Sequence, residues 1–407
     1  MCKIGSPLLS FLLCSLCTPL QKSICEHYNG EDVISLTLNG VVKRDLENPS
    51  GKMPTTFDGY QFVDPNDLLL CLFDIDVTPR CVGLVKDHGV TSPAYSRFKI
   101  HSGFCNAYYN YLLRFIDDEK VFVHLSKNLR SSLTESDFGA IKTIVPPKAE
   151  QQRIADHLDK RTFEIDTLLS NARSSIEEYK KLKQAVITQT VTKGVRGERE
   201  MKDSGVEWIG EIPVNWTIQR FARVAEVKSN LVSPDNYLEY PQISPENIEK
   251  DSGKLLLPCR TVAEVGVISG NHLFYKGQIL YSKIRPKLNK VCIAPFDGLC
   301  SADMYPIETN NDTRYIMYCI LSNGFLQQVS MITENRVKMP KINQVELSKI
   351  LVAIPETIAE QKEIADHLDA KCAEIDKLIA KKEQLVKELE SYKKSLIYEV
   401  VTGKREV

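Results

Sequence analysis

The chain has 407 residues, of which 43 % are hydrophobic, and a formal net charge of −1 from 52 Lys and Arg against 53 Asp and Glu. This length exceeds one ordinary hydrophobic core, so it predicts two or more domains. A chain without excess positive charge does not attract nucleic acid as a whole, and any such binding requires local basic patches.

The first thirty residues carry the apolar run PLLSFLLCSLC, in which Cys14 and Cys17 have C-x-x-C spacing. One such pair supplies only two of the four ligands of structural zinc, so we interpret the twelve cysteines as reduced, mostly buried thiols of a cytoplasmic protein and expect no metal. A signal-peptide core is an open alternative for this run. Pro7 and Pro19 bracket it, and it is shorter than the roughly 20 apolar residues that span a bilayer.

Residues 33–145 alternate apolar stretches with turns rich in Pro, Asn, Asp and Gly, which indicates a mixed domain. Strands are predicted for DLLLCLF at Asp67, CVGLV at Cys81 and VFVHL at Val121, and a helix for NAYYNYLLRFI at Asn106. We expect a twisted, largely antiparallel sheet with a few helices.

Residues 148–193 contain neither Gly nor Pro, although the chain has 20 Gly and 19 Pro, so they predict one uninterrupted helix. Pro146 and Pro147 mark its start and Gly194 its end. Residues 149–192 carry seven acids and seven bases, which is typical of a solvated helix and not of a stripe that follows phosphates.

Residues 201–216 hold both tryptophans of the chain and have no counterpart in its first half. Residues 217–354 then repeat the mixed pattern: QILYSKI at Gln278, VCIA at Val291 and ILVAIP at Ile350 predict strands, and TRYIMYCILSNGFLQQV at Thr313 predicts a helix. We therefore expect a second domain of the same class.

Residues 356–402 predict a second long helix, with Pro355 before it, Gly403 after it, and Thr357 and Glu360 spaced as a capping box. At an offset of 210, residues 149–192 match residues 359–402 at 18 of 44 positions. The chain is therefore interpreted as a tandem duplication of one unit, a globular block followed by a helix.

Apolar residues recur every seven positions along both helices, which predicts a seam for a partner helix. The nearest partner is the other helix, although packing of each helix on its own block is the alternative. The predicted pairing residues are Leu158, Ile165, Ala172, Tyr179 and Val186 in the first helix and Leu368, Ile375, Leu378, Leu385, Leu389, Tyr392 and Leu396 in the second.

Basic side chains gather in a few loops, among Asn, Ser and Thr residues that suit contacts to phosphates and base edges. The stretch YSKIRPKLNK has four bases and no acid, whereas its counterpart FDIDVTPR is acidic until its last residue. Solvated surface turns are the simpler interpretation of each cluster. The candidate DNA contacts are Arg80, Lys127, Arg130, Lys283, Arg285, Lys287, Lys290, Arg336, Lys338 and Lys341.

Catalytic motifs are missing from the sequence: it has no G-x-G, no GxxxxGK[ST], no HExxH and no (N/D)PP(Y/F). Asp118-Glu119-Lys120 fits half of a nuclease signature but lacks the Pro-Asp partner. His157 and His367 occupy equivalent helix positions and are interpreted as packing or partner contacts. We expect no catalytic residue and no cofactor in this chain.

The stretch MKDSGVEWIGEIPVNW at Met201, followed by IPETIAEQKEIADHLDAKCAEIDKLI and matched earlier by VPPKAEQQRIADHLDKRTFEIDTLL, resembles the specificity subunit of type I restriction-modification systems. ISLTLNGVVKRD at Ile34 and DIDVTPRCVGLV at Asp74 are also similar to target recognition domains. The likeness covers nearly the whole chain outside residues 1–30.

The resemblance implies an α+β fold with target recognition domains at 1–148, incomplete at its start relative to the repeat, and at 201–358. Conserved helices at 149–200 and 359–407 would pair as an antiparallel coiled coil with pseudo-twofold symmetry. Each domain would read one half of a bipartite, asymmetric site in double-stranded DNA, and the helices would set the half-site spacing.

The resemblance also implies partners: two modification subunits that use S-adenosylmethionine and, through them, restriction subunits that use ATP and Mg²⁺. A protein-binding coiled-coil scaffold that reads no DNA, and an enzyme with an unrecognised site in one block, are the alternatives.

Overall fold

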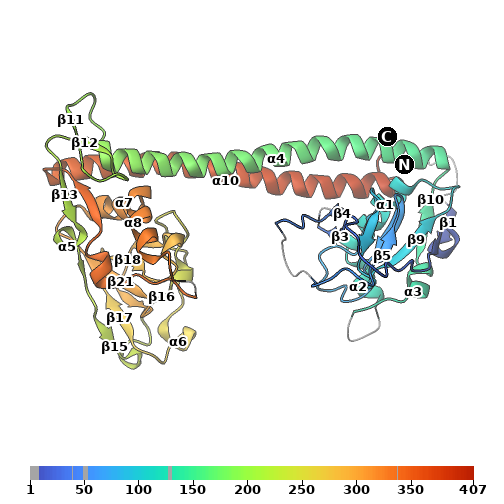
Figure 1. The fold of residues 1–407 in the computed structure, drawn as a ribbon, viewed down its shortest axis with the longest axis horizontal. Helices are drawn as coiled ribbons and strands as arrows, with labels where there is room; N and C mark the ends of the chain where they lie inside the picture. Colours follow the sequence, from blue (N-terminus) through green and yellow to red (C-terminus); the bar gives the residue numbers. More distant parts are fainter. Residues whose placement is uncertain (1–8, 39, 49–53, 127–130, 337) are drawn as a thin grey trace. The chain divides into compact units, whose positions relative to one another are not determined.

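A computed structural model of the chain describes residues 9–38, 40–48, 54–126, 131–336 and 338–407 (Figure 1). It forms two compact units, residues 1–172 with 385–407 (the first unit) and residues 173–384 (the second unit). Each unit holds one globular block together with part of both long helices. The division therefore passes through the helices and not through the ends of the blocks.

The first block is built on a four-stranded antiparallel sheet in the order β2-β9-β6-β7, with the strand pairs β1-β10, β5-β8 and β3-β4 around it. Its elements are β1 (Leu9–Leu12), η1 (Leu13–Ser15), β2 (Cys17–Pro19), β3 (Ile34–Thr37), β4 (Gly40–Lys43), β5 (Gln61–Val63), β6 (Asp67–Leu70), β7 (Val82–Leu84), β8 (Gly89–Thr91), β9 (Ser96–Ile100), α1 (Asn106–Asp118), α2 (Val121–Leu125), α3 (Glu135–Gly139) and β10 (Lys142–Val145).

The second block repeats this design with the sheet β14-β21-β18-β19 and the pair β13-β22. Its elements are β11 (Met201–Asp203), β12 (Glu211–Pro213), β13 (Thr217–Arg220), α5 (Phe221–Val224), β14 (Glu226–Val227), β15 (Leu231–Val232), η2 (Pro234–Asn236), β16 (Gln242–Ile243), η3 (Pro245–Asn247), α6 (Val262–Val265), β17 (Asn271–Phe274), β18 (Ile279–Ser282), η4 (Pro286–Leu288), β19 (Val291–Ile293), β20 (Gly298–Cys300), β21 (Met304–Glu308), α7 (Thr313–Leu321), α8 (Asn323–Thr333), α9 (Gln344–Leu347) and β22 (Leu351–Ile354). A second sheet, β15-β17-β20-β16, contains the one parallel pairing among the described strands, β16 with β20.

The two blocks have the same strand order in their main sheets. β6 and β7 of the first block occupy the places of β18 and β19 in the second, and α1 and α7 pack against β7 and β19 respectively. The duplication inferred from the helices therefore extends through the globular blocks, and the expectation of largely antiparallel sheets is confirmed.

Two element assignments from the sequence are wrong. VFVHL, expected as a strand, is helix α2, in which buried Phe122 packs 6.1 Å from the ring of Phe138, so local packing overrides the β-propensity of its valines. The helix expected from Thr313 is two helices, α7 and α8. They break at Ser322, which has extended backbone dihedral angles and whose Oγ accepts from the N–H of Phe325 to begin α8.

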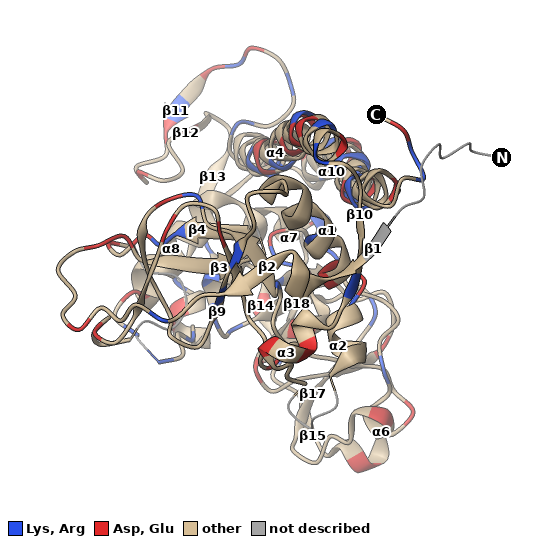
Figure 2. Cartoon of the chain, turned by 90° about the vertical axis from the view of Figure 1, so that its right-hand side faces the viewer, with Lys and Arg blue, Asp and Glu red and all other residues tan. Residues whose placement is uncertain are grey.

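The two long helices are α4 (Lys148–Lys193) and α10 (Ile358–Val401), within two residues of the predicted bounds. Gly194 and Gly403 follow them at φ 74° and 71°, a left-handed conformation that glycine adopts without strain. Lys and Arg are interleaved with Asp and Glu along both helices (Figure 2).

The helices pair with each other in both units. In the first unit, Leu158 and Ile165 of α4 share a buried core with Leu396 and Val400 of α10. In the second unit, Ile187 and Val191 near the end of α4 share a core with residues 364, 368 and 372 near the start of α10. The start of one helix thus lies against the end of the other, which is antiparallel pairing.

The buried seam differs in part from the predicted one. Leu385 and Tyr392 are 40 % and 48 % exposed, and Leu378 is 37 % exposed, so these three lie off the seam. The first stripe of α10 contains Leu368 and Ile375, and the predicted second stripe follows it by three residues. In the structure the second stripe follows the first by four residues. It is formed by Cys372, Ile379, Val386, Lys393 and Val400. Of the other predicted pairing residues, Leu158, Ile165, Ala172, Leu368, Ile375 and Leu396 are buried, whereas Tyr179, Val186 and Leu389 are half-buried.

Candidate nucleic-acid interface

The first residues of each long helix form a repeated stretch, at 149–159 and 359–369, which we call the repeated helix opening. This stretch binds each block to its helix. Gln151 in α4 and Gln361 in α10 are separated by the repeat offset of 210, and their Oε1 atoms accept from the backbone N–H of Cys105 at 2.8 Å and of Asp312 at 2.9 Å. Cys105 and Asp312 are the N-cap residues of α1 and α7. In both blocks, the equivalent glutamine thus accepts a hydrogen bond from the backbone N–H at the start of the equivalent helix.

The last aspartate of the repeated stretch acts in the same way. Asp159 accepts from the hydroxyl of Tyr111 at 2.7 Å, and Asp369 accepts from that of Tyr318 at 2.8 Å. Burial raises the pKa of both tyrosines, which therefore donate as neutral phenols. The near-identity of the two stretches thus follows from one docking geometry used twice.

The two helix histidines are not part of this docking: His157 is half-buried and His367 is exposed.

The second block presents a basic turn at the end of β18 (residues 283–290). Arg285 and Asn289 both have left-handed backbone conformations, at φ 45° and 43°, on either side of η4. Buried Asn289 donates from Nδ2 to the carbonyl of Leu321 at 3.1 Å, which ties the turn to the end of α7. The turn is therefore anchored at its base, while Arg285 and Lys287 remain exposed.

The structure brings the basic turn together with the second basic cluster (residues 336–341), about fifty residues later in the chain. The N–H of Arg285 donates to the carbonyl of Pro340 at 2.8 Å, and that of Ile342 donates to the carbonyl of Lys283 at 2.9 Å. Ile284 and Lys341 form an isolated antiparallel bridge. The two clusters of the sequence are thus one surface.

A groove of about 510 Å³ opens beside this surface. It is lined by basic, acidic, hydroxyl and apolar side chains from four segments: Ser244, Pro245, Glu246, Ser282, Ile284, Arg285, Leu288, Lys290, Asp303 and Met339. Such a mixture offers donors and acceptors as well as positive charge, which contacts to base edges require. Sequence reasoning missed Ser244, Glu246 and Asp303, because only tertiary packing places them beside the turn.

The predicted basic residues of the second block differ in what they contact. Lys283 lies 5.2 Å from the ring of Tyr305, and Lys290 donates to the carbonyl of Pro245 at 2.7 Å. Arg336 pairs with Glu346, and Lys341 pairs with Asp303 at 3.1 Å. The hydrogen bonds from Arg336 lower the pKa of Glu346. These four side chains therefore have structural partners.

Three predicted bases, Arg285, Lys287 and Lys338, are exposed, and their side chains have no ion pair or hydrogen bond within the described ranges. These three are the bases of the surface that remain available to a ligand.

At the equivalent place in the first block, the turn between β6 and β7 is described throughout and is not basic. Arg80, proposed as a DNA contact, is buried and pairs with Asp117 at 3.4 Å and Asp118 at 2.9 Å, so its expected role is corrected to an internal one. Its guanidinium anchors the turn after β6 to the end of α1. The candidates Lys127 and Arg130 lie outside the described residues.

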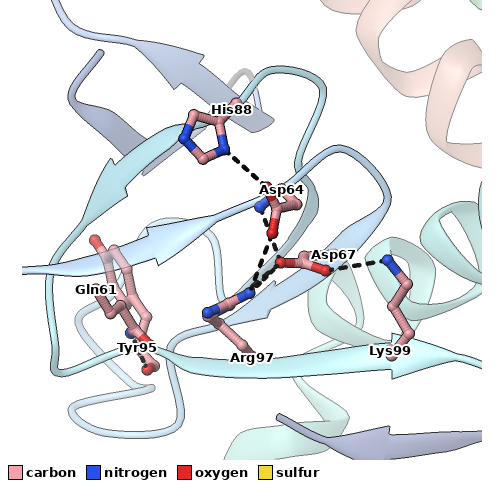
Figure 3. A network of polar contacts seen from close by, with 7 residues as sticks. All are labelled: Gln61, Asp64, Asp67, His88, Tyr95, Arg97 and Lys99. Atoms are coloured by element: carbon pink, nitrogen blue, oxygen red, sulfur yellow. Dashed lines mark hydrogen bonds and ion pairs between the residues drawn. The ribbon is translucent and has the colours of Figure 1, made fainter. Parts of the chain in front are cut away.

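Other bases of the first block are engaged within its sheet (Figure 3). Buried Arg97 pairs with buried Asp67 at 2.6 Å, and Lys99 approaches the other oxygen of Asp67 at 3.5 Å. Asp64 lies beside them and contacts His88 at 2.7 Å (Figure 3). A charge pair this deeply buried acts structurally, because the desolvated partners satisfy each other.

The described part of the amino-terminal apolar run, from Leu9 onward, is part of the fold. β1 pairs with β10, Cys17 is buried and Cys14 is exposed. Burial raises the pKa of Cys17 to about 12. Among the residues that the structure describes, no three His, Cys, Asp or Glu side chains gather as they would around a metal ion. No helix in the described ranges has the length and apolar character needed to cross a membrane.

Comparison with known proteins finds a family model that matches the second block. Residues 213–388 match the family model described as "Type I restriction modification DNA specificity domain". These residues are similar to a type I DNA specificity domain, and we refer to them below as the specificity domain. The basic turn, the 336–341 cluster and the groove all lie within this specificity domain, together with the first part of α10.

Relatives of the chain are specificity subunits. The chain is 36 % identical over 252 residues to the type I restriction enzyme EcoDI specificity subunit of Escherichia coli, a match that covers 58 % of this chain and 56 % of that protein. It is 26 % identical over 311 residues to the putative type I restriction enzyme MjaX specificity subunit of Methanocaldococcus jannaschii, covering 73 % and 67 %. The chain thus spans little more than half the length of the Escherichia coli relative.

The fold is also shared with a solved structure that concerns complex assembly and conformational transition of the type I R-M system. The match has a TM-score of 0.68 at 12 % identity and covers 97 % of this chain and 98 % of that chain. The chain thus has an α+β fold, with two mixed blocks and two long helices, and this fold is already known from that structure.

Proposed function

We propose that the chain is the DNA sequence-recognition subunit of a type I restriction-modification complex and is not itself an enzyme. Residues 1–148 and 201–358 act as two target recognition domains, each of which reads one half of a bipartite, asymmetric site. The helices at 149–200 and 359–407 set the spacing of the half-sites.

The observation that carries this proposal is the basic surface of the specificity domain. Its exposed bases, Arg285, Lys287 and Lys338, have no internal partner in the described ranges, and they border a groove that also contains Glu246 and Asp303. Phosphate contacts supply affinity that depends on salt, whereas donors and acceptors in a groove distinguish bases. Because the chain has a net charge of −1, this local surface is where DNA contact concentrates.

Catalysis and cofactors belong to partner subunits in this proposal. Two modification subunits supply S-adenosylmethionine chemistry, and restriction subunits bound through them supply ATP- and Mg²⁺-dependent cleavage. Exposed apolar residues on the helices support docking of protein partners there: Phe163 is 73 % exposed, Leu168 54 % and Leu182 49 %. A helix surface of this kind is typical of a site that a partner helix covers.

The proposal is tested by footprinting the chain with its modification partner on genomic DNA fragments, comparing R285A/K287A with the matched control R223A/K276A. The control removes one exposed Arg and one exposed Lys from the same block, away from the groove. If the turn reads bases, R285A/K287A weakens protection of one half-site by about 1 to 3 kcal/mol per lost base contact and leaves the other half-site unchanged.

Each lost phosphate contact also lowers the slope of binding against salt by about 0.9. Equal binding by R285A/K287A and R223A/K276A would contradict the assignment of the turn. If the parent chain protects DNA fragments regardless of their base sequence, this result would favour the protein-binding scaffold over DNA recognition.

The spacer role has a separate test. A four-residue insertion in α4 lengthens the gap between the methylated half-sites, mapped across the host genome, and leaves both half-sequences unchanged. Each added helical residue contributes about 1.5 Å along the axis. New half-sequences after such an insertion would contradict the role of the helices as a spacer.

A further inference from the structure

Two ion pairs connect the long helices, and they are related by the sequence repeat. In the second unit, Nζ of Lys183 lies 2.8 and 3.0 Å from the two carboxylate oxygens of Asp376. In the first unit, Nζ of Lys393 lies 2.7 Å from both oxygens of Asp166. The repeat offset of 210 converts one pair into the other with the two helices exchanged.

The spacing of the pairs agrees with a single antiparallel register. Asp166 precedes Lys183 by 17 residues in α4, and Lys393 follows Asp376 by 17 residues in α10. Equal steps in opposite directions along the two helices mean that both pairs form in the same alignment. A shift of either helix by one turn would separate both pairs.

The lysines occupy seam positions, where a charged side chain needs a partner. The side chain of Lys183 is 8 % exposed and that of Lys393 is 19 % exposed, in stripes that are otherwise uncharged. Within residues 179–186, Lys183 is the only residue identical to its counterpart 210 positions later. The lysine thus keeps its place in a stretch where its neighbours have changed.

Burial alone would raise the pKa of Asp376, but hydrogen bonds from Lys183 and Lys254 outweigh this effect and lower the pKa. The carboxylate is therefore held in its charged form by its two lysine partners.

The alternative alignment of the helices is unfavourable for the same four residues. If the repeats lay parallel and in register, Lys183 would face Lys393 and Asp166 would face Asp376, which places like charges together. A buried charge without a partner is far more costly than an exposed one. Polar residues in a helix seam are known to select register and orientation in this way.

We propose that the Lys183–Asp376 and Lys393–Asp166 pairs determine the antiparallel orientation and register of α4 and α10. They are positioning residues, which act by excluding other alignments. The consequence for half-site spacing rests on the proposed function, whereas the register itself does not.

The two pairs differ in one respect. Asp376 also accepts from Lys254 at 2.7 Å, a residue of the turn between Ile248 and Leu255 in the second block. This third partner ties the block to the helix pair beside a groove that also contains Glu249 and Asp251. No described lysine outside the helices joins the Lys393–Asp166 pair in the same way.

The test exchanges charges without changing the net charge. D166K/K183D reverses both residues of α4, D376K/K393D reverses both residues of α10, and the third variant carries all four substitutions. Either half-exchange opposes like charges in both units, so hydrogen exchange of the seam amides near both pairs accelerates by about tenfold or more. The four-fold variant recovers the parent rate near residues 166 and 393.

Lys254 provides an internal check. In the four-fold variant it faces a lysine at position 376, so recovery in the second unit is incomplete until K254E is added. The control E177K/K180E reverses an exposed pair that lies within α4 and leaves exchange unchanged.

The proposal is overturned if the half-exchanges leave the rates unchanged, or if the four-fold variant with K254E is as unprotected or unfolded as the half-exchanges. A half-exchange that does not fold still agrees with the proposal, provided that the four-fold variant with K254E folds with the protection of the parent. The variant with all four substitutions and K254E could regain the slow hydrogen exchange of the parent and still protect no half-site on DNA. That result would contradict the proposed function and leave the register assignment in place.

Discussion

The turn between β6 and β7 and the turn between β18 and β19 occupy the same place in equivalent sheets, yet they present opposite charge. The first carries exposed Asp74 and Asp76 and buries its only arginine against the end of α1. The second exposes Arg285 and Lys287. The two copies thus keep the residues that form the core and those that hydrogen-bond to the backbone at helix ends. The turn between two strands can diverge, because it contributes little to the core.

Both turns are nevertheless anchored to the equivalent helix. The N–H of Cys81 donates to Asp117 in α1 at 2.9 Å, and the side chain of Asn289 donates to the carbonyl of Leu321 in α7. The base of the turn is therefore similar in the two blocks, and only its tip differs. The proposed reading of two unlike half-sites requires such a difference between the two turns.

The largest expected difference between the units concerns the glutamate of the repeated helix opening. Buried Glu360 accepts from Arg199 at 2.7 Å and from Nε1 of Trp216 at 3.2 Å, whereas Glu150 is partly exposed and pairs within its own helix with Arg153. E360A leaves buried donors unpaired and is expected to destabilise the second unit by about 3 to 5 kcal/mol. E150A is expected to change stability by less than about 0.5 kcal/mol.

Both variants are measured by urea unfolding. Both tryptophans lie in the second unit, so tryptophan fluorescence follows E360A, and circular dichroism follows E150A. Equal losses in the two variants would show that the two openings are equivalent in energy as well as in sequence.

A smaller effect is expected from the two arginines of the turns. R80A removes charged hydrogen bonds from buried Asp117 and should cost about 1.5 to 3 kcal/mol of stability. R285A should leave stability within about 0.5 kcal/mol, because the side chain is exposed, and should reduce DNA binding instead. Thermal unfolding and footprinting of both variants separate the two roles, and a loss of stability in R285A would contradict the contrast.

The smallest expected effect is on acid stability. The folded-state pKa of Asp376 lies below its unfolded value of about 3.9. Its contribution to stability is therefore complete above the unfolded pKa and is lost as the pH falls through the folded pKa. The urea midpoint of the second unit, followed by tryptophan fluorescence, should decrease less between pH 5 and pH 3 in D376N than in the parent. The same decrease in both would show that Asp376 does not contribute.

Local sequence signals predicted the long helices well and the short elements unevenly. The bounds of α4 and α10 follow from a lack of Gly and Pro and from residues that end helices, all of which act locally. The capping box predicted from Thr357 and Glu360 forms only in part: the N–H of Glu360 donates to Thr357 at 3.3 Å, but its carboxylate turns to Arg199 and Trp216. A buried partner distant in sequence competes for the same side chain.

The sequence predicted separate parts of the candidate site but not how they come together. The basic stretches at 283–290 and 336–341 were found as separate clusters, because their charge pattern is local. Their union, and the contribution of Ser244, Glu246 and Asp303, depend on strand order, which joins segments tens of residues apart. Arg80 was placed wrongly for the same reason: a lone base after an acidic stretch looks exposed until α1 supplies its partners.

The sequence by itself determined the duplication, the two helices and the contrast between an acidic and a basic turn, since each is a pattern of residues close together or repeated at one offset. The tertiary structure decided which stripe of α10 is buried, which bases are engaged and which turns share a groove. Both Leu385 and Val386 satisfy a heptad pattern, and only the position of the partner helix leaves Val386 half-buried and Leu385 exposed.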